Sequence, residues 1–269
     1  MTENSPLSPE KFEEIAIVSR ETMDRLRLYA DHLVTSQARL NLVSRNSLAD
    51  LWGRHMLDSI QLVRHLPEDA ESITDIGSGA GFPGLVLAIA TGLPTVLVES
   101  HHRKSDFLRE AAALTEAPVT VTTARVGTFA AALNAAAATA AYGYDDGYED
   151  EAGQEAGGPD ESPDPQASPE SANDSVDILT ARALAPLDKL CEMADSLHAR
   201  TCLFHKGGRW RKELTEAEKH WTMTVETFES VTSPDGSILR ITGLQKKTKP
   251  RASRAGHPTN SPGVRRSGT

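Results

Sequence analysis

Three glycines that lie between two apolar stretches are the residues of this chain best suited to chemistry. Residues 73–84 read Ile-Thr-Asp-Ile-Gly-Ser-Gly-Ala-Gly-Phe-Pro-Gly and contain Gly77, Gly79 and Gly81. Glycine permits positive φ and lets a ligand approach the backbone closely. A helix expected at 84–91 would offer its unpaired N–H groups to polar or anionic ligand atoms. This strand, turn and helix predict a cradle for a nucleotide cofactor.

An acidic residue follows the next predicted strand. Residues 95–98 lead into Glu99, 22 residues after Gly77, and a carboxylate there can accept hydrogen bonds from ribose hydroxyls. Folds that bind NAD and folds that bind S-adenosylmethionine share this arrangement. Asp75 within the first strand, the G-x-G-x-G spacing and the lack of a second dinucleotide-binding half favour S-adenosylmethionine. NAD(P) or FAD, and a glycine turn that binds nothing, are the alternatives.

The elements that must position these residues alternate along the chain. Strands are predicted near 73–76, 95–98, 119–122, 176–179 and 201–205, and helices near 84–91, 103–115, 126–138 and 185–197. Such alternation predicts a mainly parallel sheet with helices on both faces. Two further strands, 222–229 and 237–244, meet at Pro234-Asp235-Gly236, a turn sequence typical of a hairpin. We expect this hairpin to form an antiparallel edge.

Two helical segments are predicted before the first strand. Apolar residues recur at helical spacing over 8–38 and over 47–65. Ser8 is suited to cap the first helix, with Pro9 at its first position. The predicted fold class is therefore α/β, a Rossmann-like sheet with an N-terminal helical layer over 8–65 and an antiparallel C-terminal edge hairpin. We expect one domain over residues 1–245.

Acidic residues are concentrated in one part of the chain. The net charge is −10, but residues 126–181 contain twelve Asp and Glu and no Lys or Arg, so without these twelve charges it is +2. Residues 139–174 have few large aliphatic side chains, and we predict a disordered acidic insertion in a helix-to-strand connection. A merely solvated insertion and a regulatory or partner-binding loop are both open interpretations.

The end of the chain carries the opposite charge. Residues 246–269 contain seven Lys and Arg and no acid, and Pro and Gly interrupt any helix. We predict a disordered basic tail that serves non-specific phosphate contact or solubility.

The absence of targeting signals in the sequence indicates the cellular compartment of the protein. There is no apolar run long enough to span a membrane and no pattern of a signal peptide at the N-terminus. Cys191 and Cys202 have neither metal-ligand nor disulfide spacing. We expect a cytoplasmic protein with two free thiols, no metal and no membrane contact.

Segments outside the glycine turn resemble one protein family. In chain order they are Leu40-Asn41-Leu42-Val43-Ser44, Arg54-His55-Met56-Leu57-Asp58-Ser59, residues 75–84, residues 121–127, Thr180-Ala181-Arg182-Ala183 and His205-Lys206-Gly207. Their order and spacing resemble the RsmG family, also called glucose-inhibited division protein B. The likeness covers roughly residues 10–130 and 175–245, and the R-H-x-x-D-S segment is its most discriminating part. Members are bacterial methyltransferases that modify N7 of a guanine in small-subunit ribosomal RNA.

The resemblance implies a reaction. It implies that the protein, expected to be a monomer, transfers a methyl group from S-adenosylmethionine to N7 of a guanine in 16S rRNA of the small ribosomal subunit. Guanine N7 carries a free lone pair, so the reaction requires alignment rather than a general base, and no catalytic base is predicted. The alternatives are a small-molecule or protein methyltransferase on the same fold and a non-enzymatic S-adenosylmethionine-binding ribosome-assembly factor.

The expected cofactor site lies at the carboxyl ends of the first strands. The predicted cofactor-binding residues are Asp75, Gly77, Gly79, Gly81, Phe82, Glu99, Val126, Gly127 and Arg182. The resemblance places adenine against Val126 and Gly127, although relatives usually carry an acid at the second of these positions. It also places Arg182 against the cofactor. The alternative for Phe82 is a role in the hydrophobic core. The alternative for Arg182 is that it is a plain surface residue.

The expected RNA contacts lie on two segments. The predicted RNA-binding residues are Arg54, His55, Lys206 and Arg209. With Asn41, the first two are expected to position the guanine, and Ser44 is a further candidate for a hydrogen bond to the base. For the first segment, the alternative is an ion pair between Arg54 and Asp58 within one helix, with His55 packed beside it. For the second segment, the alternative is that Lys206 and Arg209 are solvated surface cations.

Overall fold

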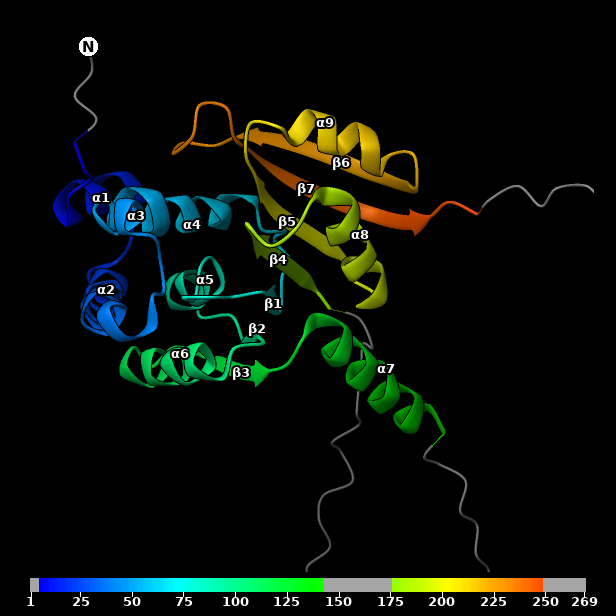
Figure 1. Ribbon diagram of the computed structural model, residues 1–269, viewed down its shortest axis with the longest axis horizontal. Coiled ribbons are helices and arrows are strands. Elements are labelled where there is room, and N and C mark those ends of the chain that lie inside the picture. Colours follow the sequence, from blue (N-terminus) through cyan, green and yellow to red (C-terminus); the bar gives the residue numbers. More distant parts are fainter. Residues whose placement is uncertain (1–4, 143–175, 249–269) are drawn as a thin grey trace, which may run out of the picture.

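A seven-stranded sheet organises the fold of the described residues, 5–142 and 176–248 of a computed structural model (Figure 1). Its strand order is β3-β2-β1-β4-β5-β7-β6. The first five strands pair in parallel, and β7 pairs antiparallel with both of its neighbours. The strands are β1 (Ile73–Ile76), β2 (Thr95–Glu99), β3 (Val119–Thr123), β4 (Ile178–Arg182), β5 (Thr201–Lys206), β6 (Trp221–Glu229) and β7 (Ser237–Lys246). The predicted sheet and its antiparallel edge hairpin are confirmed.

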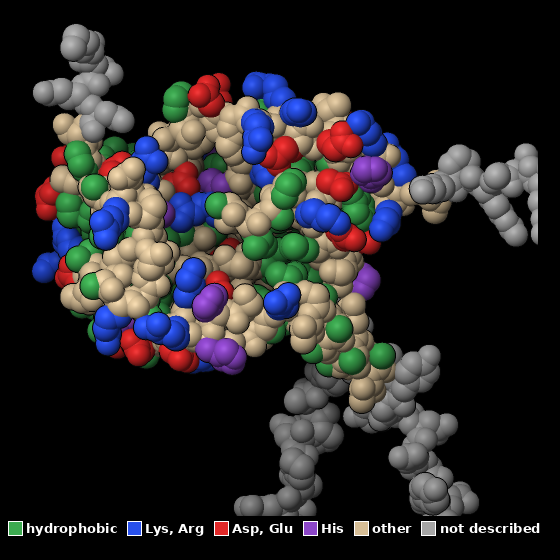
Figure 2. All heavy atoms as spheres, viewed as in Figure 1, with side chains coloured by type: hydrophobic (Ala, Val, Ile, Leu, Met, Phe, Trp, Pro, Cys, Tyr) green, Lys and Arg blue, Asp and Glu red, His purple; other side chains and the backbone are tan. Residues whose placement is uncertain are grey.

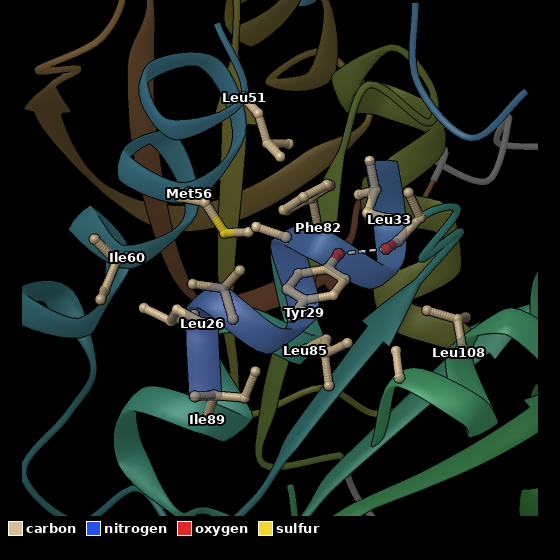
Figure 3. Packing of buried hydrophobic residues seen from close by; sticks show 14 of the residues in the cluster. Leu26, Tyr29, Leu33, Leu51, Met56, Ile60, Phe82, Leu85, Ile89 and Leu108 are labelled. Atoms are coloured by element: carbon tan, nitrogen blue, oxygen red, sulfur yellow. Dashed lines mark hydrogen bonds between the residues drawn. The ribbon is translucent and has the colours of Figure 1, made fainter. Parts of the chain in front are cut away.

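Helices cover both faces of this sheet. One face carries α2, α5 and α6 around a core that includes Leu26, Leu85 and Leu108 (Figure 3). The other face carries α7, α8 and α9 over β4, β5 and the hairpin. The longer helices are α1 (Pro9–Ala16), α2 (Arg20–Leu40), α5 (Gly84–Thr91), α6 (His102–Leu114), α7 (Val126–Tyr142), α8 (Leu187–Ser196) and α9 (Trp210–Ala217). The strand order reverses between β1 and β4, and ligands of open α/β sheets bind at the carboxyl edge at such a point.

The N-terminal helical layer is present but divided. The predicted helix over 8–38 is two helices, each opened by a serine, because Ser8 and Ser19 accept hydrogen bonds from Lys11 N and Thr22 N. Between the two helices Ile17 adopts φ 52°, in the left-handed region, which ends the first helix. The layer therefore bends at this point and packs over α5 and α6.

The segment that carries R-H-x-x-D-S is not one regular helix. The predicted helix over 47–65 consists of α3 (Arg45–Leu48), a π-helix η1 (Trp52–Leu57), α4 (Asp58–Ile60) and a 3₁₀ helix η2 (Gln61–His65). The Asp50 carboxylate accepts hydrogen bonds from Gly53 N and from Leu7 N, 43 residues away. A tertiary contact thus accompanies the wider turn, and π-helical turns are frequent at functional sites.

Some predicted boundaries were wrong. The fourth strand begins at Ile178 rather than 176, and the Asp177 carboxylate just before it accepts hydrogen bonds from Glu71 N and Ser72 N. Helix α7 continues to Tyr142, four residues into the predicted insertion, and α9 was not predicted. The rest of the insertion and the tail from 249 onward lie outside the described residues. Among the helices that are described, none combines the length and apolarity needed to cross a membrane.

Candidate active site

The glycine turn is held in one conformation at the carboxyl end of β1. Gly77, Gly79 and Gly81 have φ of 69°, 58° and 102°, which explains why glycine occupies all three positions. Gly77 N and Ser78 N both donate to the carbonyl of Val98 on β2. A Cβ on Gly81 would lie 2.8 Å from the Tyr29 hydroxyl. The turn is therefore packed against the N-terminal helical layer as well as the sheet.

Tyr29 fastens that layer to the turn. Its ring is fully buried, and its hydroxyl donates to the carbonyl of Ala80 beside Phe82 (Figure 3). Burial raises the pKa of Tyr29 well above its usual value, so the hydroxyl remains a donor. The sequence pattern placed Tyr29 only within the helical segment over 8–38, since its hydrogen-bond partner is 51 residues away.

We expect Tyr29→Phe to lower the free energy of unfolding by about 1–2 kcal/mol, because the buried Ala80 carbonyl loses its donor. Urea denaturation would measure this loss. The affinity for S-adenosylmethionine, measured by calorimetry, should fall as well because the turn is less firmly held. An unchanged midpoint and affinity would show that this hydrogen bond does not organise the turn.

Glu99 lies at the end of β2 with both carboxylate oxygens engaged. Oε2 accepts from Gly79 N at 2.8 Å, and Oε1 accepts from His101 N at 2.8 Å. The side chain is nearly buried, at 7% exposure. Glu99 therefore joins the glycine turn to the start of the β2–α6 connection, where the sequence pattern predicts a ribose contact.

For Glu99→Gln we expect about tenfold weaker binding of S-adenosylmethionine with kcat nearly unchanged. A glutamine retains one carbonyl oxygen, so it cannot accept from both backbone N–H groups and also serve the ribose as a charged acceptor. Calorimetry and steady-state kinetics would separate the two effects. A variant whose kcat falls while its affinity holds would contradict the ribose assignment.

Asp75 lies beneath the turn rather than open to solvent. It is fully buried, Oδ1 accepts from Thr180 Oγ1 on β4 at 2.8 Å, and the Gly84 N–H of α5 also approaches the carboxyl group. Oδ2 has no hydrogen-bond partner among the described residues. Burial raises the pKa of Asp75 from 3.8 to about 6. The sequence located this acid but not Thr180, whose role depends on the pairing of β1 with β4.

Arg182, at the end of β4, organises the neighbouring part of the carboxyl edge. Its guanidinium donates to the Arg54 carbonyl at 3.0 Å, to Asp58 Oδ2 at 3.1 Å and to His55 Nδ1 at 2.7 Å. It also lies 5.1 Å from the centre of the Phe82 ring. Arg182 is thus not a plain surface residue. The alternative ion pair between Arg54 and Asp58 is not formed, because Asp58 pairs with Arg182.

The two histidines of this region are neutral. Burial and the nearby Arg182 lower the pKa of His55 to about 4, and burial also lowers the pKa of His205. His55 therefore accepts the Arg182 hydrogen bond at Nδ1, while His205 Nε2 donates to the Asp58 carbonyl at 2.6 Å. A neutral imidazole does not attract phosphate as a cation would. His55 is thus a neutral group that holds Arg182, and its predicted role in positioning the guanine stays a prediction.

A cavity of about 560 Å³ opens beside Arg182 at the carboxyl ends of β4 and β5. The residues that carry its polar character are His55, Asp58, Arg182, His205, Lys206 and Glu213. Residues 230–237, which lead into β7, form another wall, and Asp58 is tied to them through Thr232 Oγ1 at 2.5 Å. The cavity is large enough for a single nucleobase and adjoins the glycine turn through Arg182 and Phe82.

The two cations predicted to bind RNA differ in their surroundings. Lys206 is 8% exposed, and its ammonium donates to Glu213 at 2.6 Å and to the Ala185 carbonyl at 3.0 Å. It therefore joins β5 to α9, and its contact with RNA stays a prediction. Arg209 is exposed at the start of α9 and remains a predicted RNA contact.

Other predicted residues are placed as follows. Phe82, at 4% exposure, stacks on His55 at 4.7 Å and contacts Tyr29, which is the core role left open for it. Asn41 caps the C-terminus of α2 in a left-handed conformation, and Ser44 caps α3. Val126 and Gly127 begin α7 directly after β3, at the same edge as Glu99.

Leu184 was missed by sequence reasoning. Its side chain covers Gly77, where a Cβ would meet it at 2.6 Å, yet it is 37% exposed. The only sequence signal was a leucine two residues after Arg182, after the end of a predicted strand. The two cysteines are buried and unpaired, and burial raises the pKa of Cys191 to about 12, as expected for inert thiols. Within 5–142 and 176–248, no cluster of His, Cys, Asp or Glu has a metal-binding arrangement.

The sheet order, the glycine turn after β1 and the acid that ends β2 together define a class. They are the features of a Rossmann-like, S-adenosylmethionine-dependent methyltransferase. The antiparallel β6–β7 hairpin at one edge of the sheet agrees with this class, as predicted.

Comparison with known proteins identifies the family. A family model described as rRNA small subunit methyltransferase G matches residues 22–140. The protein named ribosomal RNA small subunit methyltransferase G from Paramagnetospirillum magneticum is 42% identical over 238 residues, which cover 87% of this chain and 95% of that protein. Its namesake from Gluconobacter oxydans is 42% identical over 231 residues, 85% and 97% of the two chains. The chain belongs to this family, and the resemblance stated from the sequence is confirmed.

Solved structures of more distant proteins also match this chain. An O-methyltransferase from Bacillus cereus in complex with SAH has a TM-score of 0.47 at 14% identity and covers 90% of this chain and 100% of its own. A mutant of MtNAS in complex with S-adenosylmethionine has a TM-score of 0.44 at 13% identity, covering 89% and 85%.

Proposed function

We propose that the protein transfers a methyl group from S-adenosylmethionine to N7 of a specific guanine in 16S rRNA of the small ribosomal subunit. The observation that carries this proposal is the 42% identity, over 95% of its length, to a protein named for methylation of small-subunit ribosomal RNA. We further propose a single methyltransferase domain that acts as a monomer in the cytoplasm without a metal ion.

The described residues fit the cofactor. The glycine turn leaves room for a ligand against the backbone, Glu99 lies where ribose hydroxyls would be bound, and Asp75 has an unpartnered buried oxygen behind the turn. When bound, S-adenosylmethionine supplies an electrophilic methyl group. A buried negative charge near a cationic ligand is favourable because the surroundings screen it weakly.

The residues around the cavity suit an acceptor that needs no deprotonation. His55 accepts the Arg182 hydrogen bond at its basic nitrogen Nδ1. His205 donates to the Asp58 carbonyl through Nε2, and its basic nitrogen Nδ1 is buried away from solvent, so neither histidine offers an accessible base. Guanine N7 already carries a lone pair. We therefore propose that Arg182, held by three partners, fixes the relative position of cofactor and base, and that catalysis comes from this alignment.

The test is transfer of a labelled methyl group to small ribosomal subunits that lack the modification. The proposal expects label at one guanine N7 of 16S rRNA, located by mapping the modified nucleotide. Label in protein or metabolites alone would favour the second function class. Cofactor binding without transfer to any acceptor would favour an assembly factor. Either result would overturn the proposal.

A further inference from the structure

We propose that the start of helix α6, with the residue before it, and the short connection from β3 to α7 form a phosphate-binding surface. This surface holds the RNA strand across the cofactor side of the carboxyl edge. The surface consists of His101, His102, Arg103, Lys104 and Arg125. The inference rests on the proposed function and adds an RNA contact region on the opposite side of the glycine turn from Arg209.

The cations of this surface differ from many others in the molecule in having no carboxylate partner. Among the described residues, Arg103, Lys104 and Arg125 form no ion pair, and neither does Arg54 across the turn. Several cations elsewhere are neutralised by near neighbours, as in Arg25 with Glu21, Arg200 with Asp69 and Asp177, and Arg240 with Glu226. An unpaired cluster of positive charge is the surface feature that phosphate recognition requires.

The acids of the same edge do not cancel this charge. Glu99 is nearly buried and occupied by backbone N–H groups. Asp58 is paired with Arg182, and Glu213 is paired with Lys206. Asp106, on the next turn of α6, is paired with Arg109. The carboxyl edge is therefore electropositive around the glycine turn, even though the chain as a whole has a net charge of −10.

Helix stability does not account for the positions of these cations. Helix α6 begins at His102, and its first turn contains Arg103 and Lys104 but no acid. The positive end of the helix dipole disfavours cations there, by a few tenths of a kcal/mol each. Figure 2 shows Lys, Arg and His side chains over α6 and the adjoining edge, with Asp and Glu side chains among them. A polyanionic partner that binds next to the glycine turn would explain why cations occupy the first turn of α6.

The surface is placed firmly enough to orient a strand of RNA. Glu99 Oε1 holds His101 N at 2.8 Å, and Arg103 Nη2 donates to the Arg39 carbonyl at the end of α2 at 3.0 Å. Arg125 follows β3, and Arg209 follows β5 four strands away in the sheet. At about 4.8 Å per strand these ends are roughly 20 Å apart. Several nucleotides can therefore cross the edge and bring one base to the cavity beside Arg182.

The test compares two double variants with the same change in charge. In Arg103→Gln/Lys104→Gln, affinity for unmodified 16S rRNA at about 0.1 M salt should fall about tenfold, and the slope of log affinity against log salt should decrease by about 1.4. The matched control is Arg20→Gln/Lys219→Gln, whose side chains are exposed and ion-paired. Arg20 starts α2, about 30 Å along that helix from its end at Leu40. RNA affinity should be unchanged in the control.

The outcomes separate this surface from the proposed function. Calorimetry with S-adenosylmethionine should give wild-type affinity in both double variants, which verifies folding. If the wild-type protein methylates RNA but the two double variants bind RNA with the same affinity as each other, the proposed phosphate-binding surface is wrong. The proposed function is then unaffected. If the wild-type protein neither binds nor methylates RNA, both fail. Arg125→Glu provides a second measurement, because charge reversal should weaken RNA binding more than neutralisation, and wild-type RNA affinity there would also overturn the proposal.

Discussion

Replacing Arg182 with methionine is expected to reduce methyl transfer by about 100-fold and the free energy of unfolding by about 3 kcal/mol. Methionine retains much of the length of the side chain but removes the charge and every hydrogen-bond donor. The assay of labelled methyl transfer to small subunits would measure the first effect, and urea denaturation the second. Binding of S-adenosylmethionine, measured by calorimetry, should weaken too.

The size of the effect follows from what Arg182 holds together. Its guanidinium donates to a backbone carbonyl of the π-helix, to Asp58 and to His55. Asp58 is only 16% exposed, so losing its cation leaves a poorly solvated charge. The neutral His55 loses the donor that fixes its ring against Phe82. One substitution therefore loosens both the wall of the cavity and the residue beside the glycine turn.

Two further variants test this explanation. Arg182→Lys keeps the charge but not the planar set of donors, and it should recover only part of the stability and little of the activity. Arg182→Met combined with Asp58→Asn should lose less stability than the sum of the single variants, because the unpaired carboxylate is gone. Additive losses would mean that Arg182 and Asp58 do not act as a pair.

The sequence predicted those features of the fold that depend on local pattern. The strand, the glycine turn and helix α5 follow from residues 73–91, because glycine spacing and an apolar run act within one stretch of chain. The antiparallel edge hairpin followed from a short turn sequence between two strands. Glu99 was located by counting from Gly77, and its carboxylate does contact the glycine turn.

The features that were not predicted depend on contacts between distant residues. The π-helix accompanies a hydrogen bond from Leu7 to Asp50, and Tyr29 reaches Ala80 across 51 residues. Lys206 looked like a surface cation because its partner Glu213 lies on a helix that local pattern did not reveal. Histidine charge is equally inaccessible, since burial and Arg182 together set the pKa of His55. Residue types indicated the site, but their protonation and pairing required the packed fold.

For Asp75→Asn we expect a protein that is more stable near neutral pH yet binds its cofactor about tenfold more weakly. Burial raises the pKa of Asp75 from 3.8 to about 6, so the folded protein holds this proton more tightly than the unfolded chain. The carboxyl group therefore favours folding most below about pH 4, and that contribution is lost as pH rises through about 6. A pKa change of this size corresponds to about 3 kcal/mol.

The measurement is the free energy of unfolding of both proteins from pH 4 to pH 7. Asparagine does not titrate, so the difference should move by about 2 kcal/mol in favour of the variant across this range. Thr180→Val is the matched control, because it keeps the carboxyl group but removes its donor at 2.8 Å, and it should lower stability most at pH 7. If Asp75 served solely to support the turn, the variant would show the same pH dependence but wild-type cofactor affinity. The buried carboxylate of Asp75 destabilises the folded protein, and its attraction for a cationic cofactor explains why it is retained beside the glycine turn. The loss of cofactor affinity in Asp75→Asn would measure that attraction.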